Sequence, residues 1–148
     1  MQSVNAQRIW GAETNGARIS LAAAKPDVAV GEAVELSITF GNHGPDLLRY
    51  PRASLWFEYD HSVVGPDGRS VPLTAYGSRL KDNSAEQGGT LLDVRPAQEV
   101  SSSLEISKLY DFTQSGRYTI DVSKLVSGPS AQGYFRVTSN RITVTVRR

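Results

Sequence analysis

The stretch that decides the fold is Leu-Tyr-Asp-Phe-Thr-Gln-Ser-Gly-Arg-Tyr-Thr-Ile-Asp-Val, residues 109–122 of the 148-residue chain. Its first four residues predict a short helical turn, and the polar residues up to Gly116 predict a turn that leads into a strand. In that strand Tyr118, Ile120 and Val122 occupy every second position, so their side chains share one face. The stretch therefore predicts a β-strand with one apolar face, entered through a tight turn.

A Gly-x-Tyr sequence at the start of such a strand is typical of the tyrosine corner of immunoglobulin-like sandwiches. In that motif the phenol OH bonds the backbone a few residues upstream and fixes the crossing between the two sheets. We therefore predict an all-β fold, an immunoglobulin-like antiparallel β-sandwich of about seven to nine strands with long loops.

Other segments alternate in the same way. The clearest covers residues 33–41, where Val34, Leu36, Ile38 and Phe40 face one side and polar residues face the other. Residues 54–60 are rich in aromatic side chains and predict a further strand, with Glu58 and Asp60 as an outward, solvated pair. The remaining predicted strands cover residues 18–24, 91–94, 99–106 and 134–146, with a hairpin turn at 65–69 and a bulge or sheet switch at Ser139-Asn140.

Two segments have no periodic pattern. Residues 74–90 predict a long loop, and a loop of that length is usually either functional or disordered. Residues 124–133, rich in Ser, Gly and Pro, predict a second loop. We expect an N-terminal arm at residues 1–16 and a single immunoglobulin-like domain at residues 17–148.

The composition excludes several classes of function. Sixteen Lys and Arg balance fifteen Asp and Glu, so the net charge does not indicate a nucleic-acid or anionic-membrane partner. The chain has no cysteine, which excludes disulfides, thiolate metal sites and cysteine nucleophiles. The sequence contains no run of about 18 apolar residues, so it predicts no membrane span. The first residues lack the apolar core of a signal peptide, which leaves either a cytoplasmic protein or an exported chain without its leader.

Residues that could carry chemistry are sparse. The chain contains no Gly-x-Ser-x-Gly elbow, no His-Glu-x-x-His helix and no phosphate-binding glycine loop. His43 and His61 lie near Asp46 and Asp60, but these four residues would form a metal site only if their loops converged. We therefore expect no enzyme activity, no cofactor and no metal, with a divergent metal hydrolase as the third alternative. The residues nearest to a calcium-ligand set are Asp82, Asn83 and Glu86.

The order of motifs resembles the N-terminal, non-catalytic domain of the deuterolysin-type zinc endopeptidases. The motifs are Phe-Gly-Asn-His-Gly-Pro-Asp-Leu-Leu from residue 40, Gly-Pro-Asp-Gly-Arg-Ser-Val-Pro-Leu from 65, Leu-Asp-Val-Arg-Pro-Ala-Gln-Glu-Val from 92, the stretch at 109–120, and Ser-Asn-Arg-Ile-Thr-Val-Thr-Val from 139. The resemblance covers residues 17–146, with Pro-Ala-Gln-Glu at 96–99 in place of the usual Pro-Gly-Glu turn. A looser resemblance links the chain to intracellular proteinase inhibitors of the BsuPI type. The zinc-binding histidines of the peptidases have no counterpart here, so the resemblance implies no catalytic residue.

The resemblance implies a non-enzymatic protein-binding domain of a secreted or periplasmic protein, a propeptide-like or inhibitor-like partner of a peptidase. Tyr76, Arg79, Tyr134 and Trp10 are the expected contact residues, because aromatic and arginine side chains dominate binding hot spots. The alternative is a carbohydrate-binding or surface-adhesion module of an exported bacterial protein, in which Trp10, Trp56 or Tyr50 would stack on sugar rings. The identity of the partner, the oligomeric state, and whether the domain inhibits, chaperones or adheres stay open at this stage.

Overall fold

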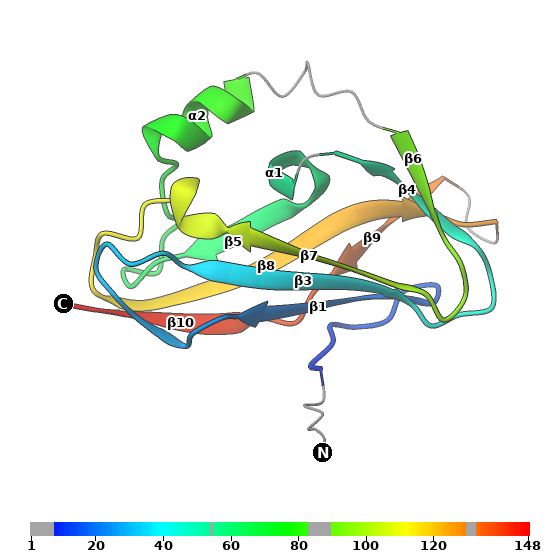
Figure 1. The fold of residues 1–148 in the computed structure, drawn as a ribbon, viewed down its shortest axis with the longest axis horizontal. Helices are drawn as coiled ribbons and strands as arrows, with labels where there is room; N and C mark the ends of the chain where they lie inside the picture. Colours follow the sequence, from blue (N-terminus) through cyan, green and yellow to red (C-terminus); the bar gives the residue numbers. More distant parts are fainter. Residues whose placement is uncertain (1–7, 54, 83–89, 130–132) are drawn as a thin grey trace.

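The computed structural model describes residues 8–53, 55–82, 90–129 and 133–148. Two β-sheets pack as a sandwich, with both helices along one side and the N-terminal arm at the opposite side (Figure 1). The helices are α1 (Leu55–Glu58) and α2 (Ala75–Asp82), and a 3-10 turn, η2, covers Ile106–Lys108. The strands are β1 (Ala17–Ala23), β2 (Asp27–Ala29), β3 (Glu35–Asn42), β4 (Leu48–Arg52), β5 (Asp60–Val64), β6 (Thr90–Val94), β7 (Glu99–Glu105), β8 (Gly116–Ser127), β9 (Tyr134–Thr138) and β10 (Ile142–Arg147).

The strand pairing confirms the predicted all-β sandwich. One sheet has the order β1-β3-β7, and the other has the order β2-β10-β8-β4-β6, with β5 and β9 also paired to β8. All pairs are antiparallel except β2 with β10. The long strand β8 organises the larger sheet, because its first half pairs with β10 and β5 while its last residues pair with β9. No helix in the described ranges is long and apolar enough to cross a membrane.

The core consists of the alternating residues that the sequence singles out. In β8, Tyr118, Ile120 and Val122 are buried, and Leu36, Ile38 and Phe40 of β3 face them across the sandwich in the same buried cluster. Burying each such side chain contributes roughly 1.5–3 kcal/mol. The alternation therefore places both central strands correctly.

The tyrosine corner is present at the start of β8. The Tyr118 hydroxyl donates a hydrogen bond of 2.7 Å to the carbonyl oxygen of Gln114, and its ring packs at 4.6 Å from that of Phe112. Gly116 has φ = 132°, and a Cβ there would lie 2.7 Å from the Pro66 side chain. The helical turn expected at residues 109–112 lies three residues earlier, in η2.

The last predicted strand is divided in two at the position where its alternation breaks. Between β9 and β10 the Asn140 side chain accepts a hydrogen bond of 2.7 Å from the Leu21 N–H and donates one of 3.0 Å to the Leu21 carbonyl. Because Leu21 lies in β1, this amide links the two sheets. Partly because of this division, the described residues form ten strands, where about seven to nine were expected.

Three local predictions are wrong. Residues 55–58 form α1 and not a strand, residues 75–82 form α2 and not a loop, and β8 continues through Lys124 to Ser127 where a loop was expected. In each case a long-range contact, described below, favours the observed structure over the local pattern. Residues 83–89, the rest of the expected loop, lie outside the described ranges, as do Asn83 and Glu86 of the calcium set.

Candidate functional site

A cavity of about 830 Å³, which we call the α2 cavity, is bounded by α1, α2, the ends of β4 and β5, the turn after η2 and the second half of β8. Ligand-binding pockets have volumes of roughly 300–1,000 Å³. The apolar lining residues include Phe57, Val71, Leu73, Leu80, Leu109 and Leu125. The polar lining residues are Arg52, Glu58, Tyr59, Asp60, His61, Lys81, Tyr110 and Lys124.

Helix α2 forms one wall and is held at its N-terminus. The Thr74 hydroxyl accepts a hydrogen bond of 3.0 Å from the Gly77 N–H and donates one to the Lys108 carbonyl, and the Thr74 N–H donates to the Leu109 carbonyl at 2.7 Å. Thr74 thus acts as an N-cap, which satisfies a backbone group that the helix leaves unpaired. A Cβ on Gly77 would lie 2.4 Å from the Leu109 oxygen. Glycine at this position therefore permits the close approach of α2 to the turn.

Helix α1 forms the opposite wall and directs Glu58 inward. One Glu58 carboxylate oxygen accepts a hydrogen bond of 3.2 Å from the Ala53 N–H. The other lies 3.0 Å from the Lys124 ammonium, and the Glu58 side chain is only 7% exposed. The predicted outward pair of Glu58 and Asp60 is thus wrong for Glu58, because a buried cation requires its carboxylate in the interior.

Lys124 lies at an inward position of β8, among aromatic rings. Its side chain is 2% exposed, and its ammonium lies 3.3 Å from the ring centroid of Tyr50 and 4.0 Å from that of Tyr59. Burial lowers the Lys124 pKa to about 8, although the Glu58 carboxylate opposes this shift. The ion pair and the ring faces together replace the water that the ammonium loses.

The two tyrosines beside Lys124 are held in their neutral form. Burial, reinforced by the Glu58 charge, raises the Tyr50 pKa, and burial raises the Tyr59 pKa well above its usual value. Among the described residues the buried Tyr50 hydroxyl has no hydrogen-bond partner. The site thus contains a polar atom whose bonding capacity is unused.

His61 adds a second unsatisfied polar atom and lines the cavity itself. Its ring packs edge-on against Tyr110 at 5.9 Å, and its Nε2 is buried with no partner in the described part of the chain. Burial lowers the His61 pKa to about 4, against an opposing effect of Asp60. At neutral pH His61 is a neutral imidazole that can donate one hydrogen bond and accept another.

The four expected contact residues do not form one cluster. Tyr76 and Arg79 both lie on α2 and are exposed, but neither lines the cavity. Tyr134, 58% exposed, lies on β9 opposite Ser127 of β8. Trp10 belongs to the N-terminal arm, and the arm lies on the side of the sandwich opposite to α2 (Figure 1).

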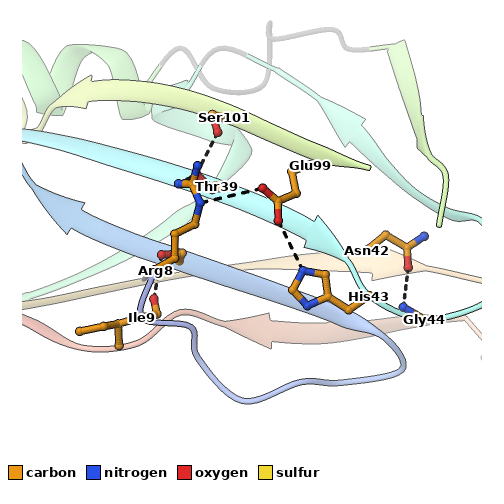
Figure 2. Close-up of polar contacts among 9 residues, drawn as sticks. Arg8, Ile9, Thr39, Asn42, His43, Gly44, Glu99 and Ser101 are labelled. Atoms are coloured by element: carbon orange, nitrogen blue, oxygen red, sulfur yellow. Dashed lines mark hydrogen bonds and ion pairs between the residues drawn. The ribbon is translucent and has the colours of Figure 1, made fainter. Parts of the chain in front are cut away.

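The described part of the arm packs on the smaller sheet. Figure 2 shows Arg8 reaching Thr39 of β3 at 2.9 Å and Glu99 of β7 at 3.9 Å, while His43 approaches Glu99 at 3.6 Å. The Trp10 ring packs edge-on against His43 at 4.8 Å. Trp10 is therefore half-buried by contacts within the chain.

This geometry gives little support to the two alternatives, a metal hydrolase and a carbohydrate-binding module. His43 contacts the arm while His61 lines the α2 cavity, so the structure does not bring the two histidines into one site. No group of three or more His, Asp or Glu residues that could hold a metal occurs among the described residues. Tyr50 is 1% exposed and cannot stack on a sugar, and the side chain of Trp56 lies outside the described part of the structure.

The sequence contains a signal for this site that the prediction of a loop after Val122 obscured. Lys124 continues the inward series of Tyr118, Ile120 and Val122, and Val126 follows it. A charged residue at an inward position requires a partner in the interior. The predicted aromatic strand carries two carboxylates, Glu58 and Asp60, and the structure shows that Glu58 is the partner.

The comparisons with known proteins support the fold alone. No protein-family model and no curated protein matches the chain. A Northeast Structural Genomics Consortium target, known from an X-ray structure, superposes with a TM-score of 0.51 at 13% identity, over 91% of this chain and 90% of that one. Two structures of a β-glucosidase from Listeria innocua, with glucose and with gluconolactone, give TM-scores of 0.39 and 0.38 at 10% and 11% identity. In both, the match covers 89% of this chain and 16% of the enzyme. The first of these similarities extends over most of both chains and supports the overall fold only.

Proposed function

We propose that the domain is a non-catalytic binding module that receives a segment of a protein partner in the α2 cavity. The observation that carries the proposal is the cavity itself, about 830 Å³ in volume, in which apolar side chains lie beside the exposed cations Arg52 and Lys81. A bound segment that covers the apolar side chains would gain free energy by removing their surface from water.

A protein is a better candidate than a small molecule because of the outer side of α2. Gly77, Leu80 and Lys81 of this helix line the cavity, while Tyr76 and Arg79 are exposed beside them. A partner that places a segment in the cavity would also cover Tyr76 and Arg79, the types of residue that form interface hot spots. We assign no catalytic role to Lys124, because its ammonium is paired with Glu58 and almost fully buried.

The resemblance to the non-catalytic domain of deuterolysin-type endopeptidases supports a peptidase as the partner and export as the context. The test is affinity capture from the secreted and periplasmic fractions of the source organism, with mass spectrometry as the readout. The wild-type domain and a Leu80→Trp variant serve as parallel baits, because the larger ring would fill the cavity from α2. Tyr134→Ala is the matched control on β9.

We expect a peptidase to be recovered by the wild-type and Tyr134→Ala baits, and its recovery to fall about tenfold with Leu80→Trp, a loss of about 1.4 kcal/mol. Adding the domain to the recovered peptidase should then change the rate of substrate cleavage. Equal recovery by all three baits would contradict binding in the cavity. Loss of recovery with Tyr134→Ala alone would place the contact on the outer face of the larger sheet, and recovery of glycans alone would favour the adhesion alternative.

A further inference from the structure

The charges around the α2 cavity are not balanced once the ion pairs are taken into account. Two carboxylates line it, and both are neutralised: Glu58 by Lys124 at 3.0 Å, and Asp60 by Arg136 at 2.7 Å. Two exposed cations, Arg52 and Lys81, also line the cavity. Neither forms an ion pair with any described residue. Within the part of the chain that the structure describes, the walls therefore carry two positive charges without a paired counter-charge.

These two cations come from different elements that bound the cavity. Arg52 ends β4, and Lys81 lies in the last turn of α2. Both side chains line the cavity. A carboxylate bound in the cavity would supply the missing counter-charge, and the arginine fork can bind it in bidentate fashion.

The rest of the cavity requires an apolar group beside the anion. Phe57, Val71, Leu73 and Leu80 line it together with the neutral ring of His61. A leucine- or phenylalanine-sized side chain would bury its surface on these walls.

We infer that the segment bound by the α2 cavity is an acidic–apolar peptide, in which a carboxylate follows or precedes a large apolar residue. The inference rests on the proposed function, because it specifies the chemistry of the partner at the same site. The carboxylate contacts Arg52 and Lys81, and the apolar side chain occupies the space between α1 and α2.

The test selects peptides from a phage-displayed random heptapeptide library on the wild-type domain, with counter-selection on Leu80→Trp. Selected peptides are synthesised as C-terminal amides, so that a side-chain carboxylate is distinguished from a free C-terminus, and their affinities are measured by fluorescence anisotropy. We expect Asp or Glu next to Leu, Ile or Phe. Replacement of that acid by its amide should weaken binding about tenfold, the loss of one charge-assisted pair.

Two charge variants complete the design. Arg52→Gln/Lys81→Gln should weaken binding by a similar factor, and raising the salt concentration should weaken wild-type binding, because exposed charges are screened. Arg117→Gln/Arg148→Gln removes the same number of exposed charges elsewhere and should leave the affinity within about twofold, as distant surface charges contribute little.

The outcomes separate this inference from the proposed function. Some peptides could lose binding to Leu80→Trp and yet carry no acidic residue, or bind Arg52→Gln/Lys81→Gln as tightly as the wild type. Such peptides would overturn the inference and leave the binding cavity intact. Peptides that bind Leu80→Trp as well as the wild type, or no enrichment at all, would overturn both.

Discussion

The Lys124 ammonium lies 3.0 Å from the Glu58 carboxylate, and neither side chain is more than 7% exposed. This ion pair joins β8 to α1 across 66 positions of sequence. It also fixes one wall of the α2 cavity, because Glu58 belongs to α1 and lines the cavity. The pair thus links the core of the sandwich to the candidate site.

Breaking this pair on one side should destabilise the domain strongly. Lys124→Met leaves the Glu58 carboxylate buried without a cation, and we expect the free energy of unfolding to fall by roughly 3–5 kcal/mol. Lys124→Met/Glu58→Gln should recover most of that loss, because no buried charge remains. Guanidinium denaturation measures both. The control is Arg49→Met in the half-exposed Arg49–Asp93 pair, for which at most about 1 kcal/mol is expected. Equal losses for the two single variants would contradict the buried role of Lys124.

His61 should make stability depend on pH in mildly acidic solution. Its pKa is lowered from 6.5 to about 4 in the folded state, so between these values the unfolded chain binds the additional proton. The free energy of unfolding contributed by His61 is therefore fully present above pH 6.5 and is lost as the pH falls toward 4, by roughly 2–3 kcal/mol. His61→Phe should reduce this loss, measured as the difference in unfolding free energy between pH 7 and pH 4.5. An unchanged slope in His61→Phe would argue against a buried neutral imidazole.

The tyrosine corner should contribute a small but measurable free energy. Tyr118→Phe removes the hydrogen bond to the Gln114 carbonyl while the ring stays against Phe112. We expect a loss of about 0.5–1.5 kcal/mol in urea denaturation, because the freed carbonyl belongs to an exposed residue that water can reach. Tyr134→Phe, at an exposed tyrosine, should change stability by less than about 0.5 kcal/mol. A loss in Tyr118→Phe no greater than in Tyr134→Phe would mean that the corner does not stabilise the crossing of the sheets.

Gly77 should control how closely α2 packs against the turn after η2. Gly77→Ala places a Cβ 2.4 Å from the Leu109 oxygen, so the helix must shift, although alanine favours helix by itself. We expect a net destabilisation of about 1–3 kcal/mol and weaker partner binding. The control Ser78→Ala, one residue further on the exposed side, should leave both stability and binding near wild type. Hydrogen exchange of α2 amides would locate the effect, and unchanged protection in Gly77→Ala would disprove the tight packing.

The sequence predicts the parts of the fold that depend on local alternation. Strand β3, the first half of β8 and the corner at Tyr118 follow from period-two patterns and turn chemistry, which operate over a few residues. The candidate site depends on contacts between distant segments. Residues 55–58 contain aromatic side chains, which favour a strand. They form α1 instead, and the ion pair of Glu58 with Lys124 is a tertiary contact of the kind that overrides local propensity.

Helix α2 illustrates the same limit. It contains Gly77 and Ser78, which are poor helix formers, so its sequence resembles a loop. Its stability comes from the Thr74 cap and from packing on Leu109, a residue that lies on a different segment of the chain. The expected contact residues Tyr76 and Arg79 were placed on a loop, but a helix presents them together. Whether they contact a partner stays a prediction.

The most direct test of the binding cavity is a map of amide chemical shifts in the ¹⁵N-labelled domain as a selected acidic–apolar peptide is added. The account predicts that the largest changes fall on Gly77, Lys81 and Leu125 at the cavity, with little change at Trp10. The same titration of Leu80→Trp should show almost none of these changes. Shifts centred on Tyr134 and Arg136, or on Trp10 and His43, with the cavity amides unmoved, would contradict binding at this site.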